Sequence, residues 1–172
     1  FHPYDASRVL GNPHILFIFP DEYREMANRV YHSLRSGRRQ FPGLKPLFGI
    51  SIEKDSVTRV PSFSLPADPD GCAPAYEGAI MQYLTRGDKP DFAVVLCEKS
   101  PRTEVASTYY CAKALLASHG IPSQIITVDL LSNDQRFEWA LADIALQMCV
   151  KLRGQPWAVV PSPGGGDVVI GV

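Results

Sequence analysis

Four residues in the second half of the chain have side chains suited to binding a terminal phosphate. Tyr109 and Lys113 are four positions apart, a spacing that places both on one face of a helix. Gln124 lies at the entry to the next apolar run, and Lys151 lies in the last turn of a long helical pattern. Two ammonium groups and an amide can hold a phosphate monoester, and a phenol can donate its hydroxyl and offer its ring to a base. The sequence therefore predicts a phosphate site with an aromatic ring beside it.

These residue types also have ordinary structural explanations. A lysine near a helix C-terminus is favoured by the helix dipole alone, and Tyr109 could be a half-buried aromatic residue. Tyr110, the next residue, competes with Tyr109 for the role of the ring. His119 could approach an anion, but a surface histidine is the simpler interpretation. His14 and His32 have no partner at metal-ligand spacing, so we predict no metal site made of protein ligands.

Short apolar runs alternate with helical patterns along the chain. The runs that are typical of strands cover residues 14–19, 46–52, 91–97 and 121–128. The helical patterns cover residues 21–36, 75–86, 104–118 and 132–152. This alternation predicts an α/β fold, a Rossmann-like parallel sheet flanked by helices on both faces. Ligands of such sheets bind beyond the carboxyl ends of the strands, where we expect residues 97–103 and the start of the following helix.

Local signals refine two of these segments. Ser132 and Gln135 have the spacing of a capping box, which predicts the start of the last helix. The apolar stripe of that helix is formed by Phe137, Leu141, Ile144 and Met148. Residues 53–72 show no helical period, and we expect a short edge strand or an irregular loop there.

Composition limits the classes of function. The chain has 172 residues, of which 45% are hydrophobic, enough for one domain with a real core. Its net charge of −1 argues against a protein that coats nucleic acid, so any such contact is local. A basic cluster, interpreted as a solvated loop, consists of Arg35, Arg38, Arg39 and Lys45. No leader or membrane-length apolar stretch is present, and the four cysteines form no Cys-x-x-Cys pair, which fits a cytoplasmic protein with reduced thiols.

The order of the four candidate residues resembles the MID domain of Argonaute proteins. The resemblance rests on Tyr109-x-x-x-Lys113, on Gly120-Ile-Pro-Ser-Gln124, and on a helix ending Lys151-Leu-Arg-Gly154 before Pro156-Trp157. It covers residues 91–172 well and residues 13–90 only by general pattern. It implies a guide-binding domain over residues 1–160. Residues 161–172 would then be a linker and the first strand of a PIWI domain, because Val169-Ile170-Gly171-Val172 matches the lead-in to its first catalytic aspartate.

The resemblance also implies roles for individual residues. Tyr109 would stack on the first guide base, while Lys113, Gln124 and Lys151 would hold its 5′-phosphate. The loop that senses the identity of this base would comprise Glu98, Lys99, Ser100, Pro101, Arg102 and Thr103.

Two accessory positions, Gln147 and Asp143, depart from the family pattern. Many eukaryotic relatives carry a lysine in place of Gln147, and an asparagine is commoner at the position of Asp143. Both differences lower the positive potential, which Mg²⁺ bridging the guide phosphates could offset, as in prokaryotic relatives. We expect this chain alone to bind the cation weakly, because the carboxylate that completes the family's cation site comes from the distant C-terminus of the parent protein.

The resemblance predicts a non-catalytic module of an Argonaute-like protein, of prokaryotic rather than eukaryotic type, that serves guide-directed silencing or defence. Its partners would be a guide RNA or DNA with a 5′-phosphate and the PIWI domain of the parent chain. The alternative is a Rossmann-like enzyme or effector-binding domain for a small phosphorylated, nucleotide or sugar ligand. No Gly-x-Gly-x-x-Gly, Gly-x-x-x-x-Gly-Lys-Ser/Thr or Gly-x-Ser-x-Gly motif supports the enzyme. The small-molecule alternatives do not require Lys113 and Lys151 to lie close together. The separation of these two lysines in the structure therefore discriminates between the alternatives and the guide-binding module.

Overall fold

A four-stranded parallel sheet forms the centre of the protein. The computed structural model describes residues 8–99 and 107–156. The strands are β1 (Ile15–Ile18), β2 (Val57–Arg59), β3 (Phe92–Cys97) and β4 (Ser123–Thr127). Their order is β2-β1-β3-β4, and every neighbouring pair is parallel. This sheet confirms the predicted Rossmann-like α/β fold and the short edge strand expected within residues 53–72.

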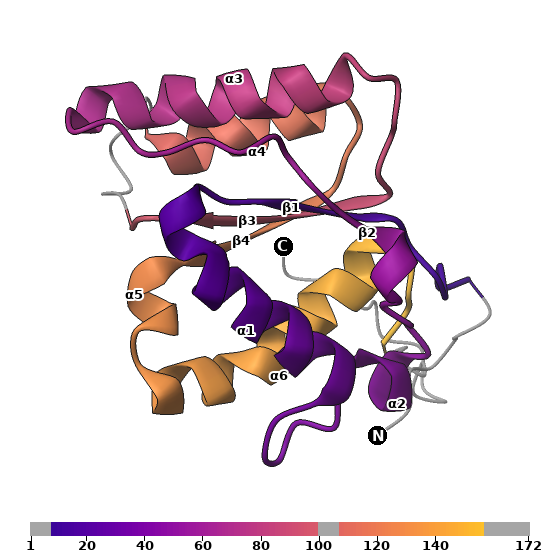
Figure 1. Cartoon of the computed structure of the whole chain (residues 1–172). Coiled ribbons are helices and arrows are strands. Elements are labelled where there is room, and N and C mark those ends of the chain that lie inside the picture. Colours follow the sequence, from indigo (N-terminus) through magenta and orange to yellow (C-terminus); the bar gives the residue numbers. More distant parts are fainter. Residues whose placement is uncertain (1–7, 100–106, 157–172) are drawn as a thin grey trace, which may run out of the picture.

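Helices cover both faces of the sheet (Figure 1). The α-helices are α1 (Arg24–Ser36), α2 (Leu44–Phe48), α3 (Cys72–Leu84), α4 (Thr108–Ser118), α5 (Val128–Leu131) and α6 (Asp134–Lys151). Short 3₁₀ turns are η1 (Asp21–Tyr23), η2 (Lys54–Ser56) and η3 (Pro69–Gly71). Helices α3 and α4 lie on one face, and α1 and α6 lie on the other. Of the described helices, none is both long and apolar enough to cross a membrane.

The two faces of the sheet carry separate hydrophobic cores. β1 and β3 are buried along their whole length, which explains why their sequences are continuous apolar runs rather than alternating ones. Phe17 and Val94 belong to the core under α1 and α6, whereas Leu16 and Ala93 belong to the core under α3 and α4. The predicted stripe of α6 is buried against the first of these cores and comprises Phe137, Leu141, Ile144 and Met148.

The strand that we expected over residues 46–52 is absent, and this prediction was wrong. The segment begins as α2, where Pro46 occupies the first turn and its missing N–H is not needed. Gly43 (φ 100°) and Gly49 (φ 71°) bound this short helix in conformations that other residues rarely adopt. Ile50 and Ile52 are nevertheless buried, so the apolar run reports burial rather than a strand.

The start of α6 also differs from the prediction. Asn133 is the N-cap residue, and its side-chain oxygen accepts a hydrogen bond of 3.0 Å from the backbone N–H of Arg136. The Ser132 hydroxyl instead donates to the carbonyl oxygen of Val128, in α5, at 2.9 Å. The capping box of Ser132 and Gln135 was therefore wrong by one residue, because α5 extends up to Ser132 and takes its hydroxyl.

We expect replacement of Asn133 by alanine to lower the free energy of unfolding by about 1 kcal/mol, since one N–H of the first turn of α6 loses its acceptor. Urea denaturation followed by circular dichroism measures the change. Ser132→Ala is the matched control and should change the value by less than about 0.5 kcal/mol. A larger loss of stability in Ser132→Ala than in Asn133→Ala would show that Ser132, and not Asn133, is the N-cap residue.

Candidate functional site

Tyr109 and Lys113 contact each other on the exposed side of α4. The Lys113 ammonium donates to the Tyr109 hydroxyl at 3.4 Å, and Nζ lies 5.4 Å from the centroid of the tyrosine ring. This geometry follows from their four-residue spacing on a helix, as the sequence predicts. The ring of Tyr110 meets that of Tyr109 edge to face at 5.0 Å. Of the two tyrosines, Tyr109 is therefore the one in contact with the lysine.

Gln124 and Lys151 form a second pair, at the amino end of β4. The Lys151 ammonium donates to Oε1 of Gln124 at 2.8 Å and to the carbonyl oxygen of Ser123 at 2.7 Å. The amide nitrogen of Gln124 donates to the carbonyl oxygen of Ile125 at 3.3 Å. Two acceptors thus hold Lys151 in a half-buried position. Sequence reasoning missed Ser123, because a backbone acceptor leaves no signature in residue types.

The end of α6 places Lys151 at this position. The N–H of Gly154 donates to the carbonyl oxygen of Cys149 at 2.8 Å, and that of Arg153 donates to Val150 at 3.1 Å, which together form a Schellman motif. Arg153 takes the left-handed conformation with φ 70°. The carbonyl oxygen of Leu152 then accepts from the N–H of Leu10 at 3.1 Å. The helix consequently stops directly after Lys151.

Electrostatics links the two pairs. Burial, and secondly the positive charge of Lys113, lower the pKa of the Lys151 ammonium from its usual range. Lys113 is therefore near enough to Lys151 to raise the cost of its charge. Within residues 8–99 and 107–156, no carboxylate forms an ion pair with either lysine. Two ammonium groups that no described carboxylate neutralises thus raise the positive potential of one region. A bound anion would be stabilised there.

The Gln124–Lys151 pair lies at the amino end of β4, the position that we expected for Gln124. Ser123 and Gln124 are the first two residues of that strand. Lys151 is found there because it is the last residue of α6, a helix that returns the chain from the carboxyl end of β4, and its C-terminus accordingly lies near the amino end of that strand. Tyr109 is in the first turn of α4, the helix that follows β3 in the chain.

The predicted base-sensing loop is described only in its first part. The carboxylate of Glu98 accepts a hydrogen bond from the Tyr23 hydroxyl at 3.1 Å, and burial followed by this carboxylate raises the pKa of Tyr23. A hydrogen bond from the Thr127 side chain, and to a smaller extent the positive charge of Lys99, lower the pKa of Asp129. The other members, Ser100, Pro101, Arg102 and Thr103, lie outside the described residues. Tyr23 was not a candidate, because 75 positions separate it from Glu98 in the sequence.

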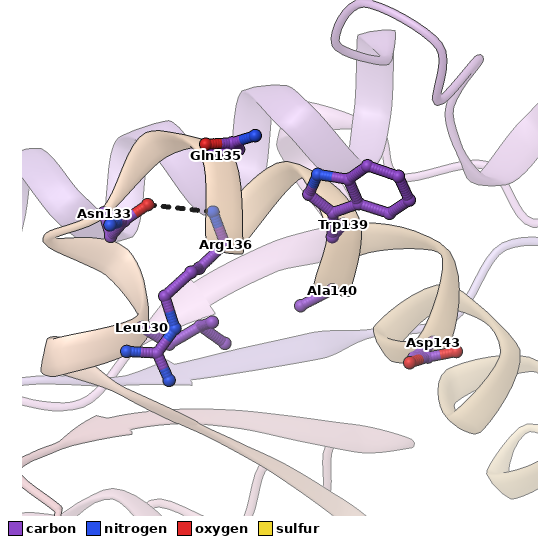
Figure 2. Close-up of a pocket in the computed structure, with 7 residues that line it drawn as sticks. All are labelled: Leu130, Asn133, Gln135, Arg136, Trp139, Ala140 and Asp143. Atoms are coloured by element: carbon purple, nitrogen blue, oxygen red, sulfur yellow. Dashed lines mark hydrogen bonds between the residues drawn. The ribbon is translucent and has the colours of Figure 1, made fainter.

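Among the described residues, neither Gln147 nor Asp143 forms a hydrogen bond with either pair. Gln147 is exposed on α6, one turn before Lys151. Asp143 lies a further turn back, where it borders two hollows on the outer side of α6. Figure 2 shows the residues that line one of them. None of the four phosphate-site candidates lines either hollow. His119 has its Nδ1 within 2.9 Å of the Leu115 carbonyl oxygen and 3.2 Å of the Ser118 hydroxyl, as a surface histidine at a helix end would.

Comparison with known proteins finds a likeness among solved structures. No protein-family model and no curated protein matches the sequence. Among solved structures, the fold is similar to that of Aa-Ago with externally bound siRNA, at a TM-score of 0.52 and 16% sequence identity. The match covers 87% of this chain and 21% of the Aa-Ago chain, so this chain spans about a fifth of that protein. At this level of identity the likeness concerns the fold, and the chain accordingly has the fold of a segment of an Argonaute protein.

Proposed function

We propose that this chain is a binding module that anchors the 5′-phosphorylated end of a guide RNA or DNA, as the MID domain of an Argonaute-like protein would. The observation that carries the proposal is that the charge of Lys113, second to burial, contributes to lowering the pKa of Lys151. Their charges act on one another, and no described carboxylate neutralises them. The fold likeness to Aa-Ago, a protein described with bound siRNA, supports a nucleic acid as the ligand.

In this proposal each side chain has a separate role. Lys113 and Lys151 bind the phosphate by charge-assisted hydrogen bonds. Gln124 orients Lys151 through its side-chain oxygen, and its amide N–H group would be a further donor to the phosphate. Tyr109 presents its ring to the first base, and stacking of this kind is worth roughly 1–3 kcal/mol. The module itself performs no chemical step, and the PIWI domain of the parent chain would be its neighbour.

A Mg²⁺ ion at this site would have to be coordinated mainly by the guide. The described part of the chain presents no group of three His, Cys, Asp or Glu side chains that could hold a metal. The lysine pair is also a poor environment for a cation. The protein residues therefore fit a Mg²⁺ ion only where guide phosphates supply most of its oxygen ligands.

The alternative of a small-molecule enzyme or effector domain has less support. Two hollows of the described structure lie on the outer side of α6, and neither is lined by Lys113 or Lys151. A small phosphorylated ligand would be expected to sit in an enclosed cleft. A strand end needs a site that is open on one side, as the exposed position of Lys113 on α4 allows.

Four oligonucleotides test the proposal: RNA and DNA of one sequence, each with a 5′-phosphate or a 5′-hydroxyl. Titration of fluorescently labelled strands in low salt with Mg²⁺ should show tighter binding of the phosphorylated member of each pair. The comparison between RNA and DNA identifies the guide. Equal affinity for phosphate and hydroxyl ends, together with binding of a free nucleotide or sugar, would contradict the proposal and favour the small-molecule alternative.

The preference for a 5′-phosphate should fall in alkaline solution. The pKa of Lys151 is lowered, so this lysine loses its proton, and with it the charge-assisted bond, before an ordinary lysine does. For folding the sign is opposite, because the unfolded chain holds more protons between the two pKa values and stability rises with pH across that window. Titrations at increasing pH measure the first effect. In the Lys151→Met variant, the alkaline loss of the 5′-phosphate preference should be absent. If this loss persisted in the variant, a titrating group other than Lys151 would cause it.

A further inference from the structure

A stripe of residues on the outer side of α6 borders a small hollow, here called the Trp139 hollow. Arg136, Trp139, Ala140 and Asp143 are three or four positions apart in turn, so they share one face of the helix. They line a hollow of about 430 Å³ together with Leu130 of α5. Figure 2 shows Ala140 between the side chains of Arg136 and Asp143, with the indole of Trp139 projecting beside it. The guide site proposed above uses none of these residues.

The Trp139 hollow has an apolar floor and an aromatic wall. Leu130 and Ala140 are half-buried and pack against the core under α1 and α6. Trp139 is 79% exposed, so its ring is available to a ligand. An exposed indole gives a large contact area at little entropic cost, and its face favours a flat ligand.

The two charged residues of the stripe have no ion-pair partner in the protein. Within residues 8–99 and 107–156, no carboxylate forms an ion pair with Arg136, and Asp143 has neither an ion pair nor a hydrogen bond. The seven positions between them correspond to roughly 10 Å along the helix axis. The Trp139 hollow therefore offers hydrogen-bond donors at one end and acceptors at the other.

A guanine base matches this arrangement. Its O6 and N7 atoms accept hydrogen bonds on one edge, as arginine requires, while N1–H and the 2-amino group donate on another edge, as a carboxylate requires. Adenine has one donor and one acceptor on the edge that would meet Asp143. The ammonium and carboxylate of a free amino acid are attached to one carbon atom, too close together to reach both Arg136 and Asp143.

A second, larger hollow borders the same indole and contains arginines that are already paired. Arg29 and Arg38 donate to Asp134 at 2.8 and 3.0 Å, and Arg38 and Arg39 donate to Glu138 at 3.3 and 2.8 Å. These ion pairs attach α1 and the loop before α2 to α6, which corrects the interpretation of Arg38 and Arg39 as parts of a merely solvated loop. Three arginines share two carboxylates, so the surplus charge of this cluster is positive and does not oppose the phosphate of a nucleotide.

We propose that the Trp139 hollow binds the base of a guanine mononucleotide. The base stacks on Trp139 over Ala140, accepts from Arg136 through O6 and N7, and donates to Asp143 through N1–H and the 2-amino group. A single nucleotide is favoured over a strand, because the hollow offers one aromatic ring and a strand stacks its successive bases on several. The lysine pair takes no part, so the proposal stands or falls independently of guide binding.

Nuclear magnetic resonance on the ¹⁵N-labelled chain tests the proposal. The readout is the indole N–H signal of Trp139, which Trp139→Phe identifies because the chain has two tryptophans. The probes are the 5′-monophosphates of guanosine, adenosine, inosine and 7-deazaguanosine, which share the phosphate and differ only in the base. We expect a saturable shift at millimolar guanine nucleotide, and about three- to tenfold weaker binding of the other three.

Two variants connect the base atoms to the side chains. Inosine lacks the 2-amino group that would meet Asp143, and 7-deazaguanosine lacks the N7 atom that would meet Arg136. The preference for guanine over inosine nucleotide should therefore vanish in Asp143→Asn, and the preference over 7-deazaguanosine nucleotide should vanish in Arg136→Met. Both residues are exposed, so the fold should be retained. Asp88→Asn removes an equal charge from another exposed position and should leave both preferences unchanged.

Several outcomes would overturn the proposal. One is equal affinity for guanine and adenine nucleotides, and another is the absence of a shift up to roughly 20 millimolar, beyond the affinity expected of such contacts. The same shift with inorganic phosphate alone would show that the base is not recognised. Tighter binding of free phenylalanine, or of a single strand than of the mononucleotide, would assign the hollow to a different ligand.

Discussion

The Lys151→Met variant is expected to bind a 5′-phosphorylated strand roughly 10- to 100-fold more weakly, because one charge-assisted hydrogen bond to the phosphate is worth about 1.5–3 kcal/mol. Binding of the matching 5′-hydroxyl strand should hardly change. Methionine keeps the length and the apolar stem of the side chain, so α6 retains its packing next to Met148 and Leu152. Titration with the two strands measures both affinities.

The control for this variant is Lys54→Met. Lys54 is an exposed residue of η2, and its removal changes the net charge by the same amount. We expect a modest weakening that is equal for the two strands, since only the long-range attraction is lost. If Lys54→Met lowered the phosphate preference as much as Lys151→Met, the effect would be one of total charge and not of the site.

Gly154→Ala is expected to destabilise the fold by about 1–3 kcal/mol. A Cβ at this position would stand 2.8 Å from the carbonyl oxygen of Cys149, 2.9 Å from Cγ2 of Val9, and closer still to the Cys149 sulfur. The carbonyl is the acceptor of the Gly154 N–H in the Schellman motif, so it cannot move away without breaking that hydrogen bond. Urea denaturation measures the loss of stability. Since the motif ends α6 at Lys151, the phosphate preference should fall as well.

The neighbouring substitution Arg153→Gly should act in the opposite direction. Arg153 has φ 70°, a conformation that costs a side-chain-bearing residue about 1 kcal/mol and glycine almost nothing. Glycine also makes the unfolded chain more flexible, which offsets part of the gain. We therefore expect a stabilisation of about 0.5 kcal/mol. A loss of stability in Arg153→Gly, or none in Gly154→Ala, would show that the end of α6 is not held as described.

Patterns with a strong physical cause could be predicted from the sequence. The apolar runs of β1 and β3 are buried on both faces, so a parallel sheet with helices on each side was the expected arrangement. The four-residue spacing of Tyr109 and Lys113 predicted that they share one face of α4, where the two side chains are in contact. Lys151 was correctly expected at the end of a helix whose buried stripe includes Phe137 and Met148.

Features that depend on tertiary contacts could not be predicted in the same way. The run of residues 46–52 is apolar because it is buried, and proline and two glycines with positive φ make it start as α2 rather than as a strand. The carbonyl of Ser123 holds Lys151, but every residue has a carbonyl, so nothing in the sequence marks this one. The contact of Lys151 with the amino end of β4 follows from the return path of α6, which only the folded chain reveals.

A double-variant cycle on Lys113 and Lys151 tests the central claim most directly, namely that both lysines bind one 5′-phosphate. The quantity to measure is the ratio of affinities for the phosphorylated and hydroxyl-ended strands, in the wild type, Lys113→Ala, Lys151→Met and the double variant. We expect a ratio of roughly ten or more in the wild type, based on the worth of a charge-assisted bond. Each single change should lower it strongly, and the double variant should have a ratio near one, with losses that do not add. Equal weakening of both strands in every variant, with an unchanged ratio, would contradict the account.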